Sequence, residues 1–443
     1  MSLSSWLKVF VDFFKGSARD KGKFAEITVL DNHPKILESE ARVLPLICGE
    51  TINQEWLSEI QKYTSRSVSV RWHDVINHAN RYETVSPIGQ IKPVRPFFRP
   101  IDQLEIISPD LPLPDWFQGE IPTELLRLAR AHCEERVYRQ ILADWVECYG
   151  GEEGRLLCRF FRRDEVLRHD ASTWQTLSAF EARLVAPFSD LVLGIGDRVV
   201  LPLTETQNIT MGWVPPGESW LAGGGGEEGT TAYTLEKGVW CGIYPVTQEQ
   251  WQAVMGNNPS CFEELPKNPV ETVSYYDVEE FLQKVNAANS RSGFLYRLPS
   301  ADEWEYILRG GPISKPQSQY HFYFAQSRTD LTPIASNDLS STQANFDTNY
   351  PDDAGVEGLS LEATSAVGNY LPNPLGMFEM HGNVAEMMSN KDGPTGTTCG
   401  GNFSNSRYYC KPSIRCMFDL GQGYYNIGFR LLAVPGRWIH SST

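Results

Sequence analysis

The sequence lacks any long apolar run, and its basic residues are outnumbered by acidic ones. No stretch of about 18 consecutive apolar residues occurs, which predicts that no helix spans a membrane. Lysine and arginine number 39 against 55 aspartate and glutamate residues, a formal net charge of -16. Because binding to phosphate groups needs a basic surface, this balance argues against nucleic acid as a partner.

Paired cysteines are also missing. The nine cysteines are an odd number, and none stands in a Cys-x-x-Cys pair. This usage is typical of reduced thiols and not of a disulfide framework, so we expect a cytoplasmic protein. Residues 1–17 lack a basic start followed by a long apolar core and a cleavage site, and they favour an amphipathic helix over a secretion signal.

Length and residue pattern predict two domains. Residues 1–205 mix helical and extended patterns, with helices expected at 123–149 and 173–185. From residue 206 to 443 the chain turns to short strands and turn residues. The first domain contains no catalytic constellation, and its helical content leads us to expect that it docks on a cytoplasmic partner protein.

Capping patterns place the helices of the second domain. The stretches 247–250 and 300–303 read Thr-x-x-Gln and Ser-x-x-Glu, the spacing of a capping box at a helix start. Gly256 is suited to close the first of these helices in the left-handed conformation. Another helix is expected near Ser274. Residues 312–376 are rich in Asn, Asp, Ser, Pro and Gly, and we expect little regular structure there.

Two carboxylates flank a glycine turn in the second domain. Glu379 and Glu386 lie on either side of His381-Gly382-Asn383. Carboxylates with backbone carbonyls between them can supply the oxygen ligands that calcium prefers. The alternative is acidic residues exposed on a loop.

The stretch 399–432 has the composition of a recognition surface. Its ends, Gly400-Gly401 and residues 427–430, bracket a middle crowded with Tyr, Phe, Ser, Asn and Gly. Tyr and Phe give a large contact area at low entropic cost, while Ser and Asn adapt their hydrogen bonding. The alternative is an ordinary loop-rich β segment.

A series of short motifs runs through roughly residues 205–434. They are Ile209-Thr210-Met211, Ile243-Tyr244-Pro245-Val246-Thr247, Pro269-Val270-Glu271, Arg297-Leu298-Pro299-Ser300, Gln343-Ala344-Asn345-Phe346, Gly376-Met377-Phe378-Glu379-Met380-His381-Gly382-Asn383-Val384 and Gly428-Phe429-Arg430. Together they resemble the formylglycine-generating enzyme (sulfatase-modifying factor) family. The resemblance implies an α+β protein: a C-type-lectin-type fold over residues 206–443, with a separate mixed, helix-containing N-terminal domain.

The same resemblance implies structural calcium. On the family pattern, the carboxylates of Glu379 and Glu386 and the carbonyls of Gly382 and Val384 form one site. Asn345 belongs to a second site, for which the sequence does not place an acidic ligand.

Two cysteines carry an alternative, enzymatic interpretation. Oxidases of the family hold copper between two thiolates that four residues separate, and soft thiolates are the ligands that Cu(I) prefers. Here five residues separate Cys410 from Cys416. One extra residue turns a strand side chain to the opposite face, so we expect the two thiolates not to converge. Copper-dependent oxidation of a substrate cysteine by this pair is the alternative function.

The last segment resembles another branch of the fold more closely, the variable proteins of diversity-generating retroelements. Their ending, from a Gly-Gly pair to Ile-Gly-Phe-Arg, matches residues 400–430 in spacing. The resemblance implies a non-catalytic display protein that binds a protein or other ligand through residues 403–425, with sequence variation retuning specificity. Met417 and Gln422 are not reachable from an adenine-rich Asn codon, so they should be invariant or lie outside this scheme of variation. The expected contact residues are Phe403, Ser404, Asn405, Ser406, Tyr408, Tyr409, Ile414, Cys416, Phe418, Asp419, Tyr424 and Tyr425.

Overall fold

The structure is a computed structural model, and the part of the chain that it describes consists of ten ranges. These are residues 23–29, 68–74, 80–85, 113–133, 136–163, 170–223, 227–263, 265–289, 293–349 and 360–435. The chain divides into two units, one of residues 1–107 and 113–162, the other of residues 108–112 and 163–443. The amphipathic helix expected at residues 1–17 lies outside the described residues.

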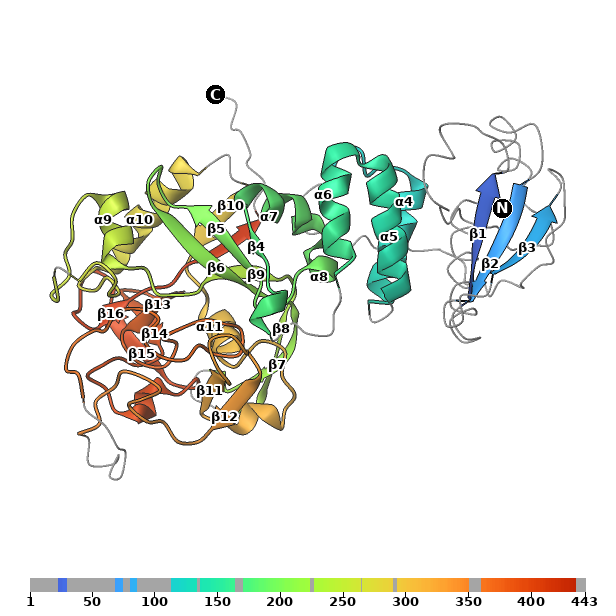
Figure 1. The fold of residues 1–443 in the computed structure, drawn as a ribbon. Helices are drawn as coiled ribbons and strands as arrows, with labels where there is room; N and C mark the ends of the chain where they lie inside the picture. The colour runs from blue at the N-terminus through green and yellow to red at the C-terminus, as the bar shows by residue number, and fades with distance from the viewer. Residues whose placement is uncertain are drawn as a thin grey trace. The chain divides into compact units, whose positions relative to one another are not determined.

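The first unit contains an antiparallel sheet and a set of helices. The sheet has three strands, β1 (Lys23–Val29), β2 (Val68–Asp74) and β3 (Asn80–Val85), in the order β1-β2-β3. The helices are α4 (Glu120–Ala131), α5 (Arg136–Tyr149) and α6 (Gly151–Phe161) (Figure 1).

The single helix expected over residues 123–149 is two helices, α4 and α5. His132 leaves the helical conformation at the end of α4, with φ -134° and ψ 45°. Its ring stacks on Tyr138 of α5 at a centroid distance of 4.6 Å, and α4 and α5 pack on each other. Periodicity alone did not reveal this break, because the buried positions keep helical spacing on both sides of it.

The second unit is built on a six-stranded sheet with the order β10-β17-β9-β6-β5-β4. Its strands are β4 (Thr176–Leu177), β5 (Arg198–Pro202), β6 (Asn208–Val214), β9 (Val239–Gly242), β10 (Phe294–Arg297) and β17 (Leu432–Pro435). Because β4 and β5 pair into this sheet, the unit begins at Arg163 and not at the expected residue 206. The helix expected at 173–185 is shorter, α7 (Ala179–Val185), and α8 (Ser189–Val192) follows it.

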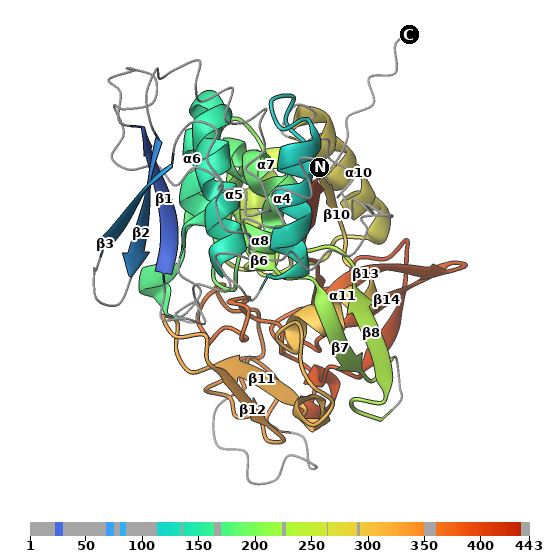
Figure 2. The ribbon, with the colours of Figure 1, turned by 90° about the vertical axis from the view of Figure 1, so that its right-hand side faces the viewer.

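A second sheet carries the last segment of the chain. Its strand order is β15-β14-β13-β16, with β13 (Ala385–Asp392), β14 (Thr395–Cys399), β15 (Arg415–Asp419) and β16 (Ile427–Gly428). Two hairpins complete the unit, β7–β8 (Gly217–Leu221 and Thr231–Leu235) and β11–β12 (Phe322–Ala325 and Pro333–Ser336). Both hairpins lie at the end of the unit away from α10 (Tyr275–Ala288) (Figures 1 and 2).

The predicted helix starts are confirmed. Thr247 caps α9 (Gln248–Met255) and Ser300 caps α11 (Ala301–Leu308), each with the reciprocal bond of a capping box. Gly256 ends α9 in the left-handed conformation, with φ 86°, and Ser274 caps α10. Between residues 312 and 376, the described residues form only the β11–β12 hairpin and one 3-10 turn.

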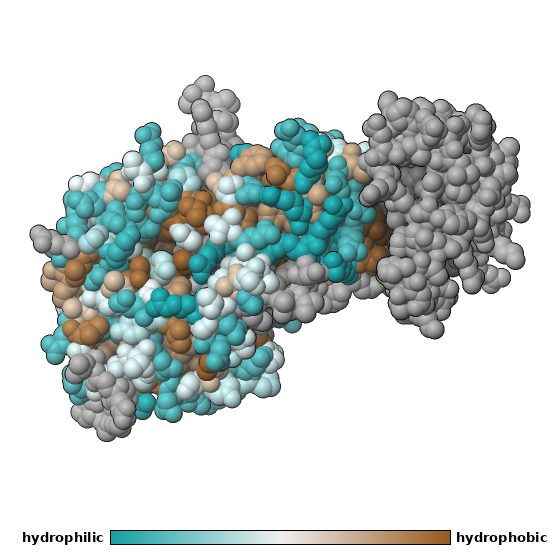
Figure 3. Space-filling view, in the orientation of Figure 1, coloured by the Kyte–Doolittle hydropathy of each residue, from teal (hydrophilic) through white to brown (hydrophobic). Residues whose placement is uncertain are grey.

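The main core lies between the two sheets, around α11. Val214, Cys241, Trp304, Met388 and Leu432 belong to one buried cluster, and they come from β6, β9, α11, β13 and β17. Hydrophilic residues cover much of the described surface in the view of Figure 3, interrupted by smaller hydrophobic areas. Among the described residues, no helix combines the length and the apolar character needed to cross a membrane.

Candidate functional site

A pair of glycines opens the last segment. Gly400 and Gly401 adopt φ angles of 95° and 66°, a region that disfavours residues with a side chain. A Cβ atom on Gly401 would lie 2.9 Å from the Cys410 sulfur and 2.9 Å from the Tyr409 backbone. Gly401 therefore lets the chain after β14 pass close to the turn at residues 407–410.

The thiol of Cys410 belongs to the core. Its side chain is fully buried in an apolar cluster with Phe322, Phe324, Leu339, Ala344 and Phe346. His381 lies against the same cluster, and its ring contacts Phe322 and Phe324 at centroid distances of 5.4 and 5.1 Å. The buried side chain of Cys410 thus fixes the turn at residues 407–410 to the core.

Three aromatic side chains between residues 403 and 425 are exposed to solvent. Tyr408 is 53% exposed, Tyr409 38% and Tyr425 49%. The rings of Tyr408 and Tyr409 pack edge to face at 5.5 Å, and the Lys411 ammonium lies 5.1 Å from the Tyr408 ring centroid. Asp419 is also exposed. The other accessible members of the predicted contact set are half-buried: Ser404, Asn405, Ile414, Cys416 and Tyr424.

Three of the predicted contact residues are buried, and the structure corrects their assignment. Phe403 and Phe418 are 2% and 5% exposed, and Ser406 is 7% exposed. Phe403 packs between Phe262 and Tyr425, at centroid distances of 5.4 and 5.9 Å. These side chains support the segment from inside and offer no surface to a ligand.

Met417 was left out of the expected contact set, although its side chain is exposed. It lies on β15 and is 58% exposed, while its neighbour Phe418 is buried. The alternation of side chains along a strand explains the difference, since successive residues point to opposite faces. The prediction placed Phe418 on the surface because of composition and left Met417 out because of its codon, and it did not use the strand pattern.

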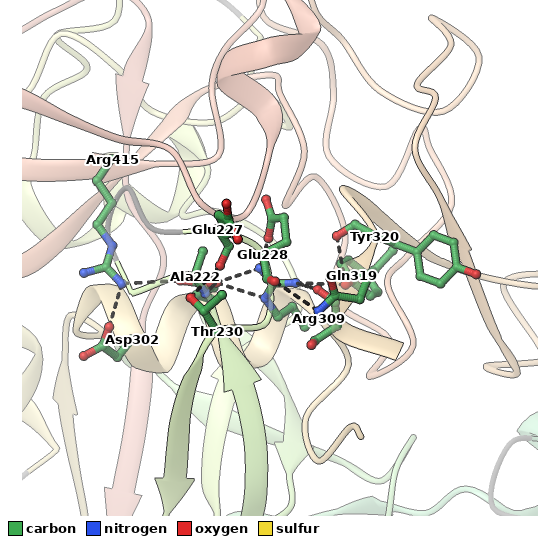
Figure 4. A network of polar contacts seen from close by, with 12 residues as sticks. Ala222, Glu227, Glu228, Thr230, Asp302, Arg309, Gln319, Tyr320 and Arg415 are labelled. Atoms are coloured by element: carbon green, nitrogen blue, oxygen red, sulfur yellow. Dashed lines mark hydrogen bonds and ion pairs between the residues drawn. The ribbon is translucent and has the colours of Figure 1, made fainter. Parts of the chain in front are cut away.

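An ionic network ties β15 to α11 (Figure 4). Arg415 donates to Asp302 at 2.6 Å and to Glu305 Oε2 at 3.4 Å. The other oxygen of Glu305 accepts from Arg309 Nε at 2.9 Å and from the Ala222 amide at 2.7 Å. Arg309 also pairs with Glu228. Glu305 thus links β15, α11 and the end of β7.

Glu386, one of the predicted calcium ligands, is engaged by Arg430 and Trp304. Oε1 of Glu386 accepts from Arg430 Nη2 at 2.7 Å and from Nε at 3.1 Å. Oε2 accepts from Arg430 Nε at 3.0 Å and from Trp304 Nε1 at 2.7 Å. Glu386 and Arg430 are 1% and 0% exposed. Both oxygens of this carboxylate are therefore occupied, and Glu386 does not fit a calcium ligand.

Glu379 is differently placed. Oε1 accepts from the Gly368 amide at 2.8 Å, while the buried Oε2 makes no hydrogen bond. Burial raises the pKa of Glu379 to about 7, although the amides of residues 368–370 and the charge of Arg430 act in the opposite direction. Its backbone has φ 51°, and it lines a small pocket with Tyr323, His381 and other residues.

Asn345 also carries an oxygen without a partner. Its Nδ2 donates to Ala363 O and to Asn383 Oδ1, at 2.9 and 3.2 Å, and its buried Oδ1 makes no hydrogen bond. A β-bridge joins its backbone to Gly382. Within the described ranges, no group of three or more His, Cys, Asp or Glu side chains could hold a metal. Glu379 and Asn345 each have an oxygen without a hydrogen-bond partner. Calcium at Glu379 with Gly382 and Val384, and calcium at a second site with Asn345, stay predictions.

The copper alternative depends on Cys410 and Cys416. Cys410 lies in the apolar cluster described above, whereas Cys416 is on β15, paired with Thr398. Burial raises the pKa of the Cys416 thiol, which favours the thiol over the thiolate that copper binds. This electrostatic environment does not favour copper, and the enzymatic alternative stays a prediction.

Several solved structures resemble the chain. Variable protein 1 of Treponema denticola is 22% identical, with a TM-score of 0.40 over 54% of this chain and 98% of that one. CarF is 21% identical, with a TM-score of 0.40 over 52% and 99%. PvdO from Pseudomonas aeruginosa is 20% identical, with a TM-score of 0.41 over 54% and 99%.

Sequence comparisons give a curated relative and a family. The chaperone protein LppX of Paenibacillus barcinonensis is 29% identical over 175 residues, which cover 33% of this chain and 59% of that protein, less than two thirds of its length. The model of the sulfatase-modifying factor enzyme 1-like domain matches residues 198–434. More than half of the sequence lies in that match, and the expected resemblance is confirmed: the chain belongs to the sulfatase-modifying factor family and has its C-type-lectin-like fold in the C-terminal region.

Proposed function

We propose that this protein is a non-catalytic display protein, the variable protein of a diversity-generating retroelement. Its C-terminal segment binds a ligand, and variation in that segment changes which ligand is bound. Residues 403–425 carry the ligand surface, and a protein is the expected ligand. Tyr408, Tyr409 and Tyr425 are the anchoring contacts, because exposed aromatic side chains give the largest contact area per residue.

The observation that supports this proposal most strongly is the division of the segment into an anchored frame and an exposed face. Cys410 and Phe403 are buried, while Tyr408, Tyr409 and Tyr425 are 38–53% exposed. A surface that accepts many sequences needs such a division, since a change at an exposed position leaves the core packing intact. The rings of Tyr408 and Tyr409 pack on each other, so these two side chains form one exposed patch and are not scattered singly.

The test is to sequence the gene and its surroundings in many sibling isolates. We expect substitutions in codons 404–426 that concentrate at the exposed and half-buried positions, such as Tyr408 and Tyr425. Codons for Cys410 and Phe403 should stay unchanged. A near-copy of the segment and a reverse transcriptase gene should lie nearby.

The rest of the same gene serves as the internal control. Codons 206–399 share its expression and history, and they should show only background variation. Equal variation in the two parts, or an unchanged segment with no template copy, contradicts the proposal. In that case copper binding to Cys410 and Cys416 is the next measurement.

The first unit is proposed to dock on a cytoplasmic partner protein. Tyr149 at the end of α5 is 68% exposed and stacks on Trp145 at a centroid distance of 5.2 Å, which gives an aromatic contact surface. Proximity labelling in the native cell tests this, with Tyr149→Glu as the comparison. The proposal is contradicted if the wild-type protein and the Tyr149→Glu variant label the same proteins. It is also contradicted if the protein is recovered outside the cytoplasmic fraction.

A further inference from the structure

The carboxylate of Glu386 is fully satisfied by protein groups. It accepts four hydrogen bonds, of which three come from Arg430 and one from the indole of Trp304, all between 2.7 and 3.1 Å. A carboxylate has about four acceptor positions on its two oxygens. No acceptor position is left for a cation.

The guanidinium of Arg430 is bound as completely as the carboxylate. Nη1 donates to the carbonyl of Gly242 at 2.8 Å, and Nη2 donates to the carbonyl of Phe378 at 2.6 Å as well as to Glu386. Gly242 is the last residue of β9 and Phe378 precedes Glu379, so the arginine joins the six-stranded sheet to the turn before β13. The planar fork of donors in the guanidinium matches this arrangement of one carboxylate and two carbonyls.

Charge is also balanced at this position. Glu386 contributes one negative charge and Arg430 one positive charge, and both side chains are buried. A divalent cation at Glu386 would have to displace the guanidinium and leave it buried without its carboxylate. Separating a buried ion pair in this way is strongly unfavourable.

We infer that Arg430 takes the place of a metal ion at Glu386, so that this junction between the two sheets forms and stays stable without calcium. The inference concerns Glu386 alone. Calcium could still bind at Glu379 or at Asn345, each of which has a buried oxygen without a hydrogen-bond partner. The test below distinguishes binding at those residues from binding at Glu386.

Thermal unfolding of the full chain tests the inference, in a calcium chelator and in excess calcium. The variant Glu386→Gln removes the charge and keeps the side-chain shape, and we expect it to lower Tm by the same amount in both conditions. Glu379→Gln is the matched control, an amide substitution at the other buried carboxylate. A calcium-dependent rise in Tm that survives in Glu386→Gln belongs to another site and agrees with the inference.

The inference is overturned if calcium raises the Tm of the wild-type chain and Glu386→Gln abolishes that rise while Glu379→Gln keeps it. A second measurement covers the case in which Glu386→Gln does not fold. Crystals of the wild-type chain are soaked with terbium, a calcium substitute with strong anomalous scattering. An intact pair of Arg430 and Glu386 with no terbium beside it supports the inference, and a terbium peak within coordination distance of Glu386 refutes it.

Discussion

The ring of His381 connects two backbone groups on opposite sides, one from Tyr323 and one from Cys410. The Tyr323 amide donates to Nε2 at 3.1 Å, which leaves Nδ1 to carry the proton and donate to the Cys410 carbonyl at 2.8 Å. The ring is buried, and burial lowers the pKa of His381 to about 4. A neutral histidine thus ties β11 to the turn that opens the proposed ligand surface.

Replacing His381 with Ala should destabilise the protein by roughly 1–3 kcal/mol, because both backbone groups would be left buried without partners. Chemical denaturation of the full chain measures the change. The control is His321→Ala, since His321 precedes the same strand and is only half-buried. If the two variants lose the same free energy of unfolding, the hydrogen bonds of His381 to Tyr323 and Cys410 contribute no more to stability than the contacts of His321.

The exposed and buried aromatic residues of the last segment should respond differently to truncation. Tyr408→Ala removes an exposed ring, and we expect a stability change within about 0.5 kcal/mol. Tyr425 also packs on Phe403 at a centroid distance of 5.9 Å, so Tyr425→Ala should cost more than Tyr408→Ala and less than truncation of Phe403. Phe403→Ala empties a buried position and should cost about 3–5 kcal/mol.

Chemical denaturation of the three variants measures these changes, and circular dichroism checks that each one folds. If Tyr408→Ala and Tyr425→Ala proved as destabilising as Phe403→Ala, the division into frame and surface would be wrong. The same tyrosine variants should lose binding to any ligand that the wild-type chain is found to bind.

Local patterns predicted the helices of the second unit well. The capping residues Thr247 and Ser300 and the closing Gly256 are set by backbone hydrogen bonds within one turn, so a short window of sequence contains the whole cause.

The buried side chains of residues 403–425 were harder to predict. Phe403 and Phe418 look like contact residues by composition, and only the contacts with Phe262 and other distant residues place them inside.

Long-range pairing explains the other differences. Glu386 was expected to bind calcium because its sequence neighbours resemble a ligand set, but its partner Arg430 lies 44 residues away. The boundary expected at residue 205 moved to 163 because β5 pairs with β6 and β4 pairs with β5, contacts that no local pattern contains. Residue spacing cannot reveal which distant side chain completes a buried group.

The backbone at Gly382 should not tolerate a side chain. Its φ is 81°, and a Cβ atom there would lie 2.3 Å from the Asn345 carbonyl oxygen. Gly256 is the matched control, with φ 86° and no atom within 4 Å of the same added carbon.

We expect Gly256→Ala to cost only the left-handed strain, roughly 1–2 kcal/mol. Gly382→Ala should cost clearly more, because the bridge to Asn345 must also open. The difference in denaturation midpoint between the two variants checks this, and no difference would mean that the turn can move away at little cost.

Stability should fall in acid partly through Glu303. Burial raises the pKa of this carboxyl, but hydrogen bonds from Arg297 and from the amide of Ser300 outweigh that effect and hold the pKa below its usual 4.5. Arg297 donates to both oxygens, at 2.6 and 2.7 Å. Because the folded chain binds this proton less readily than the unfolded chain, Glu303 stabilises the fold above about pH 4.5, and its contribution is lost as the pH falls through the folded pKa.

The variant Glu303→Gln isolates this contribution. Chemical denaturation across a pH series should show the wild-type chain more stable than Glu303→Gln at neutral pH, with the gap closing as the pH drops below about 4.5. Glu279→Gln is the control, because Glu279 pairs with Lys391 on the surface at 39% exposure and should matter little at any pH. A gap that stays constant from neutral to acidic pH would contradict an origin in the charge of Glu303. The capping box should contribute little to the gap, since the amide of Gln can accept the same hydrogen bond from Ser300.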